Sequence, residues 1–163
     1  MVPCAYAFRP ISAADLPLLG RWLTMPHVVQ WWPGGIKQLD RVRAHLDDPA
    51  IDLFIVTADD RPIGYLQCYE PGAETNHPFH DQPVGTRGID QLIGEPDMIG
   101  RGHGSALTRA FVALLFAAGA PRVITDPDPA NTRAIRAYEK AGFRAERVFD
   151  TPWGRTLLMV CQP

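Results

Sequence analysis

Three glycines stand close together in the stretch IGRGHGSALTRAFVALLFAAG, residues 99–119, just before a run of apolar residues that predicts a helix. Gly100, Gly102 and Gly104 fall within five residues, although ordering a glycine costs more backbone entropy than ordering any other residue. The backbone N–H groups of such a turn, placed at a helix N-terminus, can hold an anion such as a pyrophosphate. The first turn of the expected helix lacks Asp and Glu, and Arg101 and Arg109 lie nearby, which favours a bound anion. A flexible loop without a ligand is the alternative.

Two nucleotide-binding motifs share this glycine-rich character. A P-loop places lysine and then serine or threonine after its last glycine, but here Ser105 and Ala106 follow Gly104. The stretch GRGHGSA fits a loose form of the dinucleotide-binding fingerprint, and Asp126 lies about 20 residues downstream, where that fingerprint has an acid. The stretch comes late in the chain, which weakens this reading. A dinucleotide-binding oxidoreductase stays an alternative.

A second expected helix, in NTRAIRAYEKAGF, places a tyrosine beside small residues. Asn131, Ala134, Tyr138 and Ala141 are three, four and three residues apart, so they share one face of the helix. The alanines leave room for a ligand beside the phenol. A helical tyrosine is more often a core residue, so a structural role for Tyr138 is the alternative.

Composition limits the functions that this chain can have. Of its 163 residues, 46% are hydrophobic and 21% are charged, and the net charge is −2. These values are ordinary for a globular domain, and we expect a single domain over residues 1–163. The sequence contains no block of like charges and no long apolar run, so we expect no binding to nucleic acid or membrane. The first ten residues lack a signal-peptide pattern and the three cysteines are widely spaced, so we expect a cytoplasmic protein with reduced thiols.

Hydrophobic periodicity and turn residues predict the elements that position the glycine loop and the tyrosine. Ser12 and Asp15 have capping-box spacing, Asp128 and Pro129 suit a helix start, and Gly142 suits a helix end. Residues 71–86, rich in Pro, Gly and His, predict a long lid or binding loop. The order of elements indicates an α+β fold, a mixed sheet flanked by helices. Strands are expected in 4–11, 51–58, 62–70, 87–94, 122–126, 143–151 and 154–162. Helices are expected in 12–23, 38–48 and 128–142, and directly after the glycine loop. The helix after the glycine loop is expected to bury Leu107, Phe111, Leu114 and Ala118.

The glycine turn and the pattern N-x-x-A-x-x-x-Y-x-x-x-G-F together resemble the GNAT superfamily of N-acetyltransferases. The stretches VVQWWPGG, PIGYLQCYE, RGIDQLIG, ITDPDPANTRAIRAYEKAGF and TPWG are similar to one branch, the bacterial aminoglycoside 6′-N-acetyltransferases. The similarity runs from about Trp22 to the C-terminus. It implies the GNAT fold, with a largely antiparallel sheet splayed at its centre. It also implies acetyl transfer from acetyl-CoA to a primary amine, with the 6′-amine of an aminoglycoside as the first choice, in a monomer or homodimer.

The resemblance also implies roles on the cofactor side. The glycine loop would offer backbone N–H groups to the pyrophosphate of acetyl-CoA, and the strand at 87–94 would bind the pantetheine amides. Tyr138 would be catalytic as the general acid, since a phenol can return a proton to a departing thiolate. The expected cofactor-binding residues are Ile93, Ile99, Gly100, Arg101, Gly102, His103, Gly104, Ser105, Asn131, Ala134 and Tyr138.

On the acceptor side the chemistry calls for a carboxylate, because an alkylammonium must lose a proton before it can attack. Asp90 and Asp126 match acidic positions of the aminoglycoside branch. We expect Asp90 to be catalytic by orienting the amine, and Asp126 to bind another cationic or hydroxyl group; ordinary helix-start chemistry is the alternative for Asp126. Adjacent tryptophans can stack on a sugar or a cation, or simply pack in the core. The expected acceptor-binding residues are Trp31, Trp32, Glu74, Asp90, Gln91 and Asp126.

Two stretches depart from the aminoglycoside branch, both on the acceptor side. That branch has a tryptophan pair and an acid in the loop before RGIDQ, where this chain has GAETNHPFHDQPVG. It has an aspartate in the penultimate turn, where this chain has Trp153. His77, His80 and Asp81 suggest a metal site, but no helical register or fourth ligand accompanies them, so we expect no metal.

Four functions are to be distinguished. The first is acetylation of an aminoglycoside-like amine, and the second is the same chemistry on a siderophore-precursor lysine, a polyamine or a protein N-terminus. The third is a non-catalytic acetyl-CoA sensor, which needs neither Tyr138 nor Asp90. The fourth is the dinucleotide-binding oxidoreductase.

Overall fold

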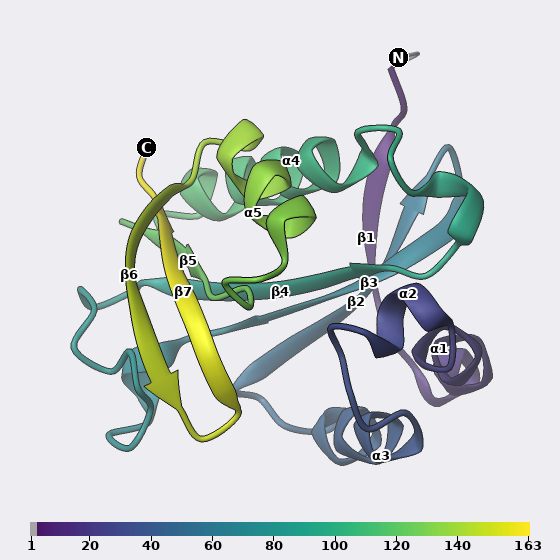
Figure 1. The fold of residues 1–163 in the computed structure, drawn as a ribbon, viewed down its shortest axis with the longest axis horizontal. Helices are drawn as coiled ribbons and strands as arrows, with labels where there is room; N and C mark the ends of the chain where they lie inside the picture. Colours follow the sequence, from purple (N-terminus) through teal and green to yellow (C-terminus); the bar gives the residue numbers. More distant parts are fainter. Residues whose placement is uncertain (1–2) are drawn as a thin grey trace. The chain divides into compact units, whose positions relative to one another are not determined.

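The computed structural model describes residues 3–163, and these contain a seven-stranded sheet with the order β1-β2-β3-β4-β5-β7-β6 (Figure 1). Strand β1 pairs with β2, and β7 with both β5 and β6, in antiparallel fashion, whereas β4 pairs with β5 in parallel. The predicted mixed sheet flanked by helices is therefore confirmed. The strands are β1 (Tyr6–Pro10), β2 (Ile51–Ala58), β3 (Arg61–Tyr69), β4 (Arg87–Ile93), β5 (Val123–Thr125), β6 (Arg144–Thr151) and β7 (Gly154–Cys161).

The chain divides into two compact units. The first contains the described residues up to Gln67 together with Gln91–His103, and the second contains Cys68–Asp90 together with Gly104–Pro163. Strands β3 and β4 contribute residues to both units. The single domain expected over residues 1–163 stays a prediction.

Three helices form the core of the first unit with β2: α1 (Leu16–Leu23), α2 (Pro26–Val29) and α3 (Ile36–His45). Their apolar faces bury Leu19, Trp22 and Leu39 against Leu53 and Ile55, which alternate on one side of β2 as strand geometry requires. The predicted capping box is present, since the Ser12 backbone N–H donates to the Asp15 carboxylate at 2.9 Å. The first turn of the helix predicted over 12–23 is a 3₁₀ turn at Ala13–Asp15, which precedes α1. Helix α2 was not predicted.

Helix α4 (His103–Ala117) buries a different face from the one expected. Leu107 and Phe111 are buried as predicted, but Leu114 is 56% exposed and Ala118 is exposed as well. The buried stripe instead includes Thr108 and Val112. It is centred between Leu107 and Val112, which leaves Leu114 at its edge, and Ala118 lies beyond the last residue of the helix.

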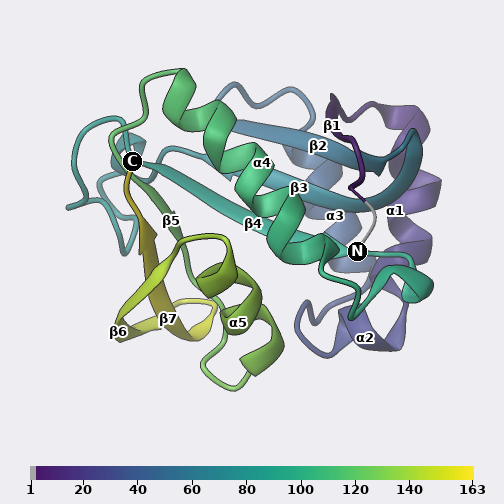
Figure 2. The same cartoon turned by 90° about the horizontal axis from the view of Figure 1, so that it is seen from above.

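Helix α5 (Thr132–Lys140) contacts β6 within the second unit (Figure 2). Gly142 ends the helix as predicted, with φ +105°, but the expected start at Asp128 was wrong. Asp128 instead closes a local turn by accepting from the Ala130 backbone N–H at 2.8 Å. Asn131 is the N-cap, because its Oδ1 accepts from the Ala134 backbone N–H at 3.1 Å.

Gly94, which follows β4, has no room for a side chain. A Cβ atom there would lie 2.1 Å from Cγ of Trp22, and the Trp22 ring is fully buried and cannot move aside. This close approach fixes the backbone just before the glycine loop against α1.

We expect Gly94→Ala to lower the free energy of unfolding by about 1–3 kcal/mol or more, because the added methyl overpacks a closed core. Gly72→Ala is the matched control, since Gly72 is exposed and a Cβ there would meet nothing within 4 Å. Urea denaturation of both variants measures the difference. Equal stability of the two variants would contradict the close packing of Gly94 on Trp22.

Candidate functional site

The glycine loop leads from the 3₁₀ turn at Pro96–Met98 directly into α4. Gly100 and Gly102 have φ values of +74° and +84°, which a side chain would strain, and both are exposed with Arg101 between them. His103 begins the helix and is buried, with its Nδ1 2.7 Å from the Tyr6 hydroxyl. The helix starts earlier than expected, so Gly104 and Ser105 lie in its first turn, which has no acidic residue.

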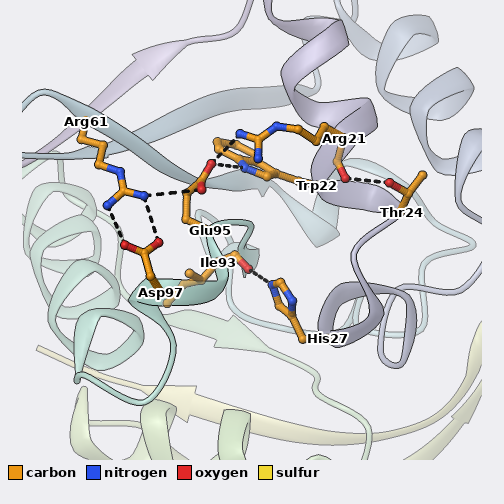
Figure 3. A network of polar contacts seen from close by, with 8 residues as sticks. All are labelled: Arg21, Trp22, Thr24, His27, Arg61, Ile93, Glu95 and Asp97. Atoms are coloured by element: carbon orange, nitrogen blue, oxygen red, sulfur yellow. Dashed lines mark hydrogen bonds and ion pairs between the residues drawn. The ribbon is translucent and has the colours of Figure 1, made fainter.

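A network of charged groups holds the segment that precedes this loop (Figure 3). Oε1 of Glu95 accepts from Nη2 of Arg21 at 2.6 Å and from Nε1 of Trp22 at 2.9 Å. Arg61 donates to both oxygens of Asp97 at 2.9 Å and lies 3.5 Å from Oε2 of Glu95. The Trp22 hydrogen bond, and then the Arg21 hydrogen bond and charge, lower the pKa of Glu95. The loop therefore begins from a backbone fixed to α1 and β3.

Two carboxylates, Asp90 and Asp126, interact in the second unit. Asp90 lies on β4 two residues beyond Gly88, the last residue of β4 that pairs with β5, and Asp126 directly follows β5. Burial, and then the negative charge of Asp90, raise the pKa of Asp126 to about 8. A hydrogen bond from Nε1 of Trp153 to Oδ2 of Asp126, 2.9 Å long, acts in the opposite direction. The nearby Thr156 hydroxyl also lowers the pKa of Asp126.

Two tyrosines belong to the same electrostatic group. Burial raises the pKa of the Tyr69 phenol well above its usual value, and the charges of Asp90 and Asp126 add to this. Tyr138, on α5, also contributes to that shift and is itself buried, with its ring edge-to-face on Phe143. The structure thus brings together Asp90, Asp126 and Tyr138 from the predicted set and adds Tyr69.

The other predicted acceptor residues are more scattered. Trp32 packs against the core of the first unit, edge-to-face with Tyr65 at 6.1 Å, and Trp31 is partly buried in the same unit. Gln91 lies on the part of β4 that belongs to the first unit. Glu74 is exposed in the 71–86 loop.

Two predicted cofactor residues make contacts within their own units. The Ile93 carbonyl lies 3.0 Å from Nε2 of His27 (Figure 3). The Asn131 side chain caps α5, using Ala134 as the donor. Each of these residues therefore has a structural contact in the protein alone.

Sequence reasoning missed Tyr69 and His77 as members of this group. His77 contacts Tyr69 and Trp153, with ring centroids 5.4 and 5.7 Å away. The only local signal was the unusual density of His, Pro and acidic residues in the loop. No three His, Cys, Asp or Glu side chains are grouped to hold a metal in the described part of the chain. Within residues 3–163, no helix is long and apolar enough to cross a membrane.

Comparisons with known proteins identify the family of this chain. The acetyltransferase (GNAT) domain profile matches residues 12–151. An aminoglycoside N(6′)-acetyltransferase type 1 from Klebsiella pneumoniae is 36% identical over 161 residues, covering 93% of this chain and 80% of that protein. An N-hydroxyputrescine acetyltransferase from Acinetobacter baumannii is 30% identical, over 83% of this chain and 65% of that protein. The chain belongs to the GNAT acetyltransferase family.

Solved structures point to the same branch of the family. The crystal structure of the aminoglycoside acetyltransferase AAC(6′)-Ib with coenzyme A and kanamycin superposes with a TM-score of 0.87 and 34% identity, covering 97% of this chain and 95% of that one. The resemblance to aminoglycoside 6′-N-acetyltransferases found in the sequence is therefore confirmed.

The raised pKa of Asp126 makes stability depend on pH. Folded Asp126 keeps its proton up to about pH 8, whereas an unfolded Asp loses it near pH 4. The unfolded state then binds fewer protons between these values, so this residue lowers stability as pH rises from about 4 to 8. We expect Asp126→Asn to be more stable than the unsubstituted protein, and by a larger margin at pH 8.5 than at pH 5.

Urea denaturation at the two pH values measures this margin. Asp81→Asn is the control, because Asp81 is exposed. A margin for Asp126→Asn that does not change with pH would show that Asp126 is already charged at neutral pH.

Proposed function

We propose that this chain transfers the acetyl group of acetyl-CoA to the 6′-amine of an aminoglycoside. The observation that carries the proposal is the grouping of Asp90, Asp126 and Tyr138, in a chain that shares 36% identity with an aminoglycoside N(6′)-acetyltransferase. Bound acetyl-CoA supplies a thioester as the acetyl donor. A cytoplasmic location, where acetyl-CoA is available, belongs to the proposal.

The glycine loop fits the pyrophosphate of that donor. Gly100 and Gly102 adopt positive φ, an arrangement that directs backbone N–H groups toward an anion, and a Cβ at Gly100 would meet nothing within 4 Å. Helix α4 adds the positive end of its dipole, with no carboxylate in the first turn to oppose an anion. Ile99, Arg101, His103, Gly104 and Ser105 complete this proposed binding segment, and Ile93, Asn131 and Ala134 would contact the rest of the donor.

The carboxylates fit a cationic acceptor. Asp90 accepts a proton from the acceptor ammonium, directly or through water, so that the amine nitrogen has a lone pair for attack. Asp126 binds a second ammonium or a hydroxyl group. A cation brought next to Asp126 lowers its pKa and stabilises the carboxylate that burial otherwise disfavours. Trp31, Trp32, Glu74 and Gln91 are proposed as further acceptor contacts.

Tyr138 is the proposed general acid. Its ring is held by Phe143 and by the helix that Asn131 caps, which restricts where the hydroxyl can lie. From that position it donates a proton to the leaving sulfur. A non-catalytic sensor would need neither this hydroxyl nor the Asp90 carboxylate.

The acceptor class is tested by measuring turnover with acetyl-CoA on kanamycin, putrescine and a lysine derivative, with the modified nitrogen located by NMR. We expect kanamycin to be acetylated at its 6′-amine. Asp90→Asn should lower kcat/KM by about 10²–10⁴-fold, since it removes the proton acceptor. Turnover on the linear amines alone would replace the aminoglycoside with the polyamine or lysine alternative.

Two controls accompany this assay. Asp81→Asn, an exposed change in the neighbouring loop, should leave kcat/KM unchanged. Calorimetry of acetyl-CoA binding should give the same affinity for Asp90→Asn as for the unsubstituted protein. Binding of acetyl-CoA without turnover on any amine would favour the sensor, and binding of NAD instead would favour the oxidoreductase.

Glu95 is a positioning residue for the glycine loop in this proposal. We expect Glu95→Ala to raise KM for acetyl-CoA about tenfold, which corresponds to about 1.4 kcal/mol, less than the usual contribution of a hydrogen bond to a charged group. Its kcat should change little, and Glu95→Gln should recover part of the affinity by keeping an acceptor for Trp22. Asp40→Ala, which removes an exposed ion pair on α3, is the control. A lower melting temperature with unchanged KM would show that Glu95 only stabilises the fold.

A further inference from the structure

Three aromatic rings from separate segments meet beside Asp126. Trp153 lies at the tip of the hairpin between β6 and β7, His77 lies in the 71–86 loop, and Tyr69 ends β3. The His77 ring is 5.7 Å from Trp153 and 5.4 Å from Tyr69, both tilted. Tyr69 is in turn held flat over Gly88, where a Cβ would lie 2.3 Å from its ring. We call Tyr69, His77 and Trp153 the aromatic cluster.

His77 contributes an uncharged ring to this cluster. Its Nδ1 accepts from the Phe79 backbone N–H at 3.1 Å, so that nitrogen carries no proton. Burial lowers the pKa of His77, more than the nearby Glu74 raises it, which favours the neutral imidazole. A neutral ring beside carboxylates does not repel a cation, as a charged histidine would.

Trp153 links the cluster to the carboxylate. Its indole is 53% exposed at the hairpin tip, yet Nε1 donates to Oδ2 of Asp126 at 2.9 Å. The tip itself is tight, because the Thr151 hydroxyl donates to the Gly154 carbonyl at 2.6 Å. An exposed tryptophan in a tight turn, hydrogen-bonded to a mostly buried acid, presents an aromatic face next to the Asp126 carboxyl group.

We propose that the aromatic cluster and Asp126 form a subsite for an ammonium group of the acceptor, and that Trp153 determines which acceptors bind there. This inference rests on the proposed function and names residues of its acceptor site. Aromatic faces and a carboxylate attract an ammonium together, the first through the ring quadrupole and the second through charge. Phosphorylated or acidic acceptors are disfavoured, because Asp90, Asp126 and Glu74 are all in this part of the second unit.

The subsite favours acceptors that carry two or more ammonium groups. One amine must be left for acetylation while another occupies the cluster. The ring face of Trp153 can contact the bound ammonium group while its Nε1–H stays hydrogen-bonded to Asp126. The aminoglycoside branch has an aspartate where this chain has Trp153. At this position a contact with a ring would therefore replace a contact with a charge.

The test compares Trp153→Ala with Trp153→Phe. Trp153→Ala removes the ring, and we expect its KM for kanamycin to rise about 3- to 30-fold, the range of cation–ring contacts, with KM for acetyl-CoA unchanged. Trp153→Phe keeps a ring without the N–H and should stay within about threefold of the unsubstituted protein. His77→Phe should also keep the affinity, and His77→Ala should lose it. Pro152→Ala, at the same turn, is the control for disturbance of the hairpin.

Calorimetry of kanamycin and of putrescine binding, in the presence of coenzyme A, separates this inference from the proposed function. If a polyamine binds and Trp153→Ala weakens it while Trp153→Phe does not, the subsite is supported even without turnover. Equal binding by Trp153→Ala and the unsubstituted protein would overturn it, and so would equal loss in both Trp153 variants. Absence of binding by either amine to the unsubstituted protein would overturn it as well. Circular dichroism melting curves establish that each variant is folded.

Discussion

The burial of Asp126 beside a second carboxylate, Asp90, is the constraint on which the candidate site depends. Two carboxylates in a mostly buried environment cannot both carry charge cheaply, so Asp126 holds a proton up to about pH 8. Trp153 supplies a hydrogen bond to Asp126 that lowers its pKa, but burial and the charge of Asp90 raise that pKa by more. The cationic acceptor proposed above would add attraction to this carboxyl group and favour its charged form. A raised pKa of Asp126 therefore fits the proposed amine site.

The glycine loop has the opposite requirement. The anion proposed for this loop needs unobstructed N–H groups, and Gly100 and Gly102 are exposed, so the rigidity of the loop must come from elsewhere. The preceding segment provides it: Gly94 lies flat on Trp22, and Glu95 accepts from Arg21 and from the same Trp22. The buried Trp22 of α1 therefore holds the backbone at Gly94 and Glu95, which is far from it in the sequence. Exposed glycines that follow an anchored segment suit the phosphate contact proposed above.

The differences from the aminoglycoside branch concentrate where the acceptor is expected. The glycines of the loop and the Asn131, Ala134 and Tyr138 pattern of α5 match the family, whereas the 71–86 loop and the β6–β7 turn have different side chains that contact one another through His77 and Trp153. Loops tolerate such changes because they carry few core contacts, while the segments that hold a common donor do not. Similarity to both an aminoglycoside and a hydroxyputrescine acetyltransferase fits a shared donor chemistry with a variable acceptor.

The sequence by itself determined the order of the strands and of every α-helix except α2, the end of α5 at Gly142 and the glycine loop before α4. These features depend on local periodicity and on residues with restricted backbone preferences, which neighbours in the chain are enough to express. It also named Asp90, Asp126 and Tyr138. Asn131 rather than Asp128 caps α5 through a contact only three residues away, so this local feature was predicted wrongly from the sequence. Only the tertiary structure decided that Leu114 is exposed, and that Trp153 and His77 lie beside Asp126. Those outcomes depend on which segments pack together over long separations in sequence, and the burial that raises the pKa of Asp126 exists only after that packing has formed.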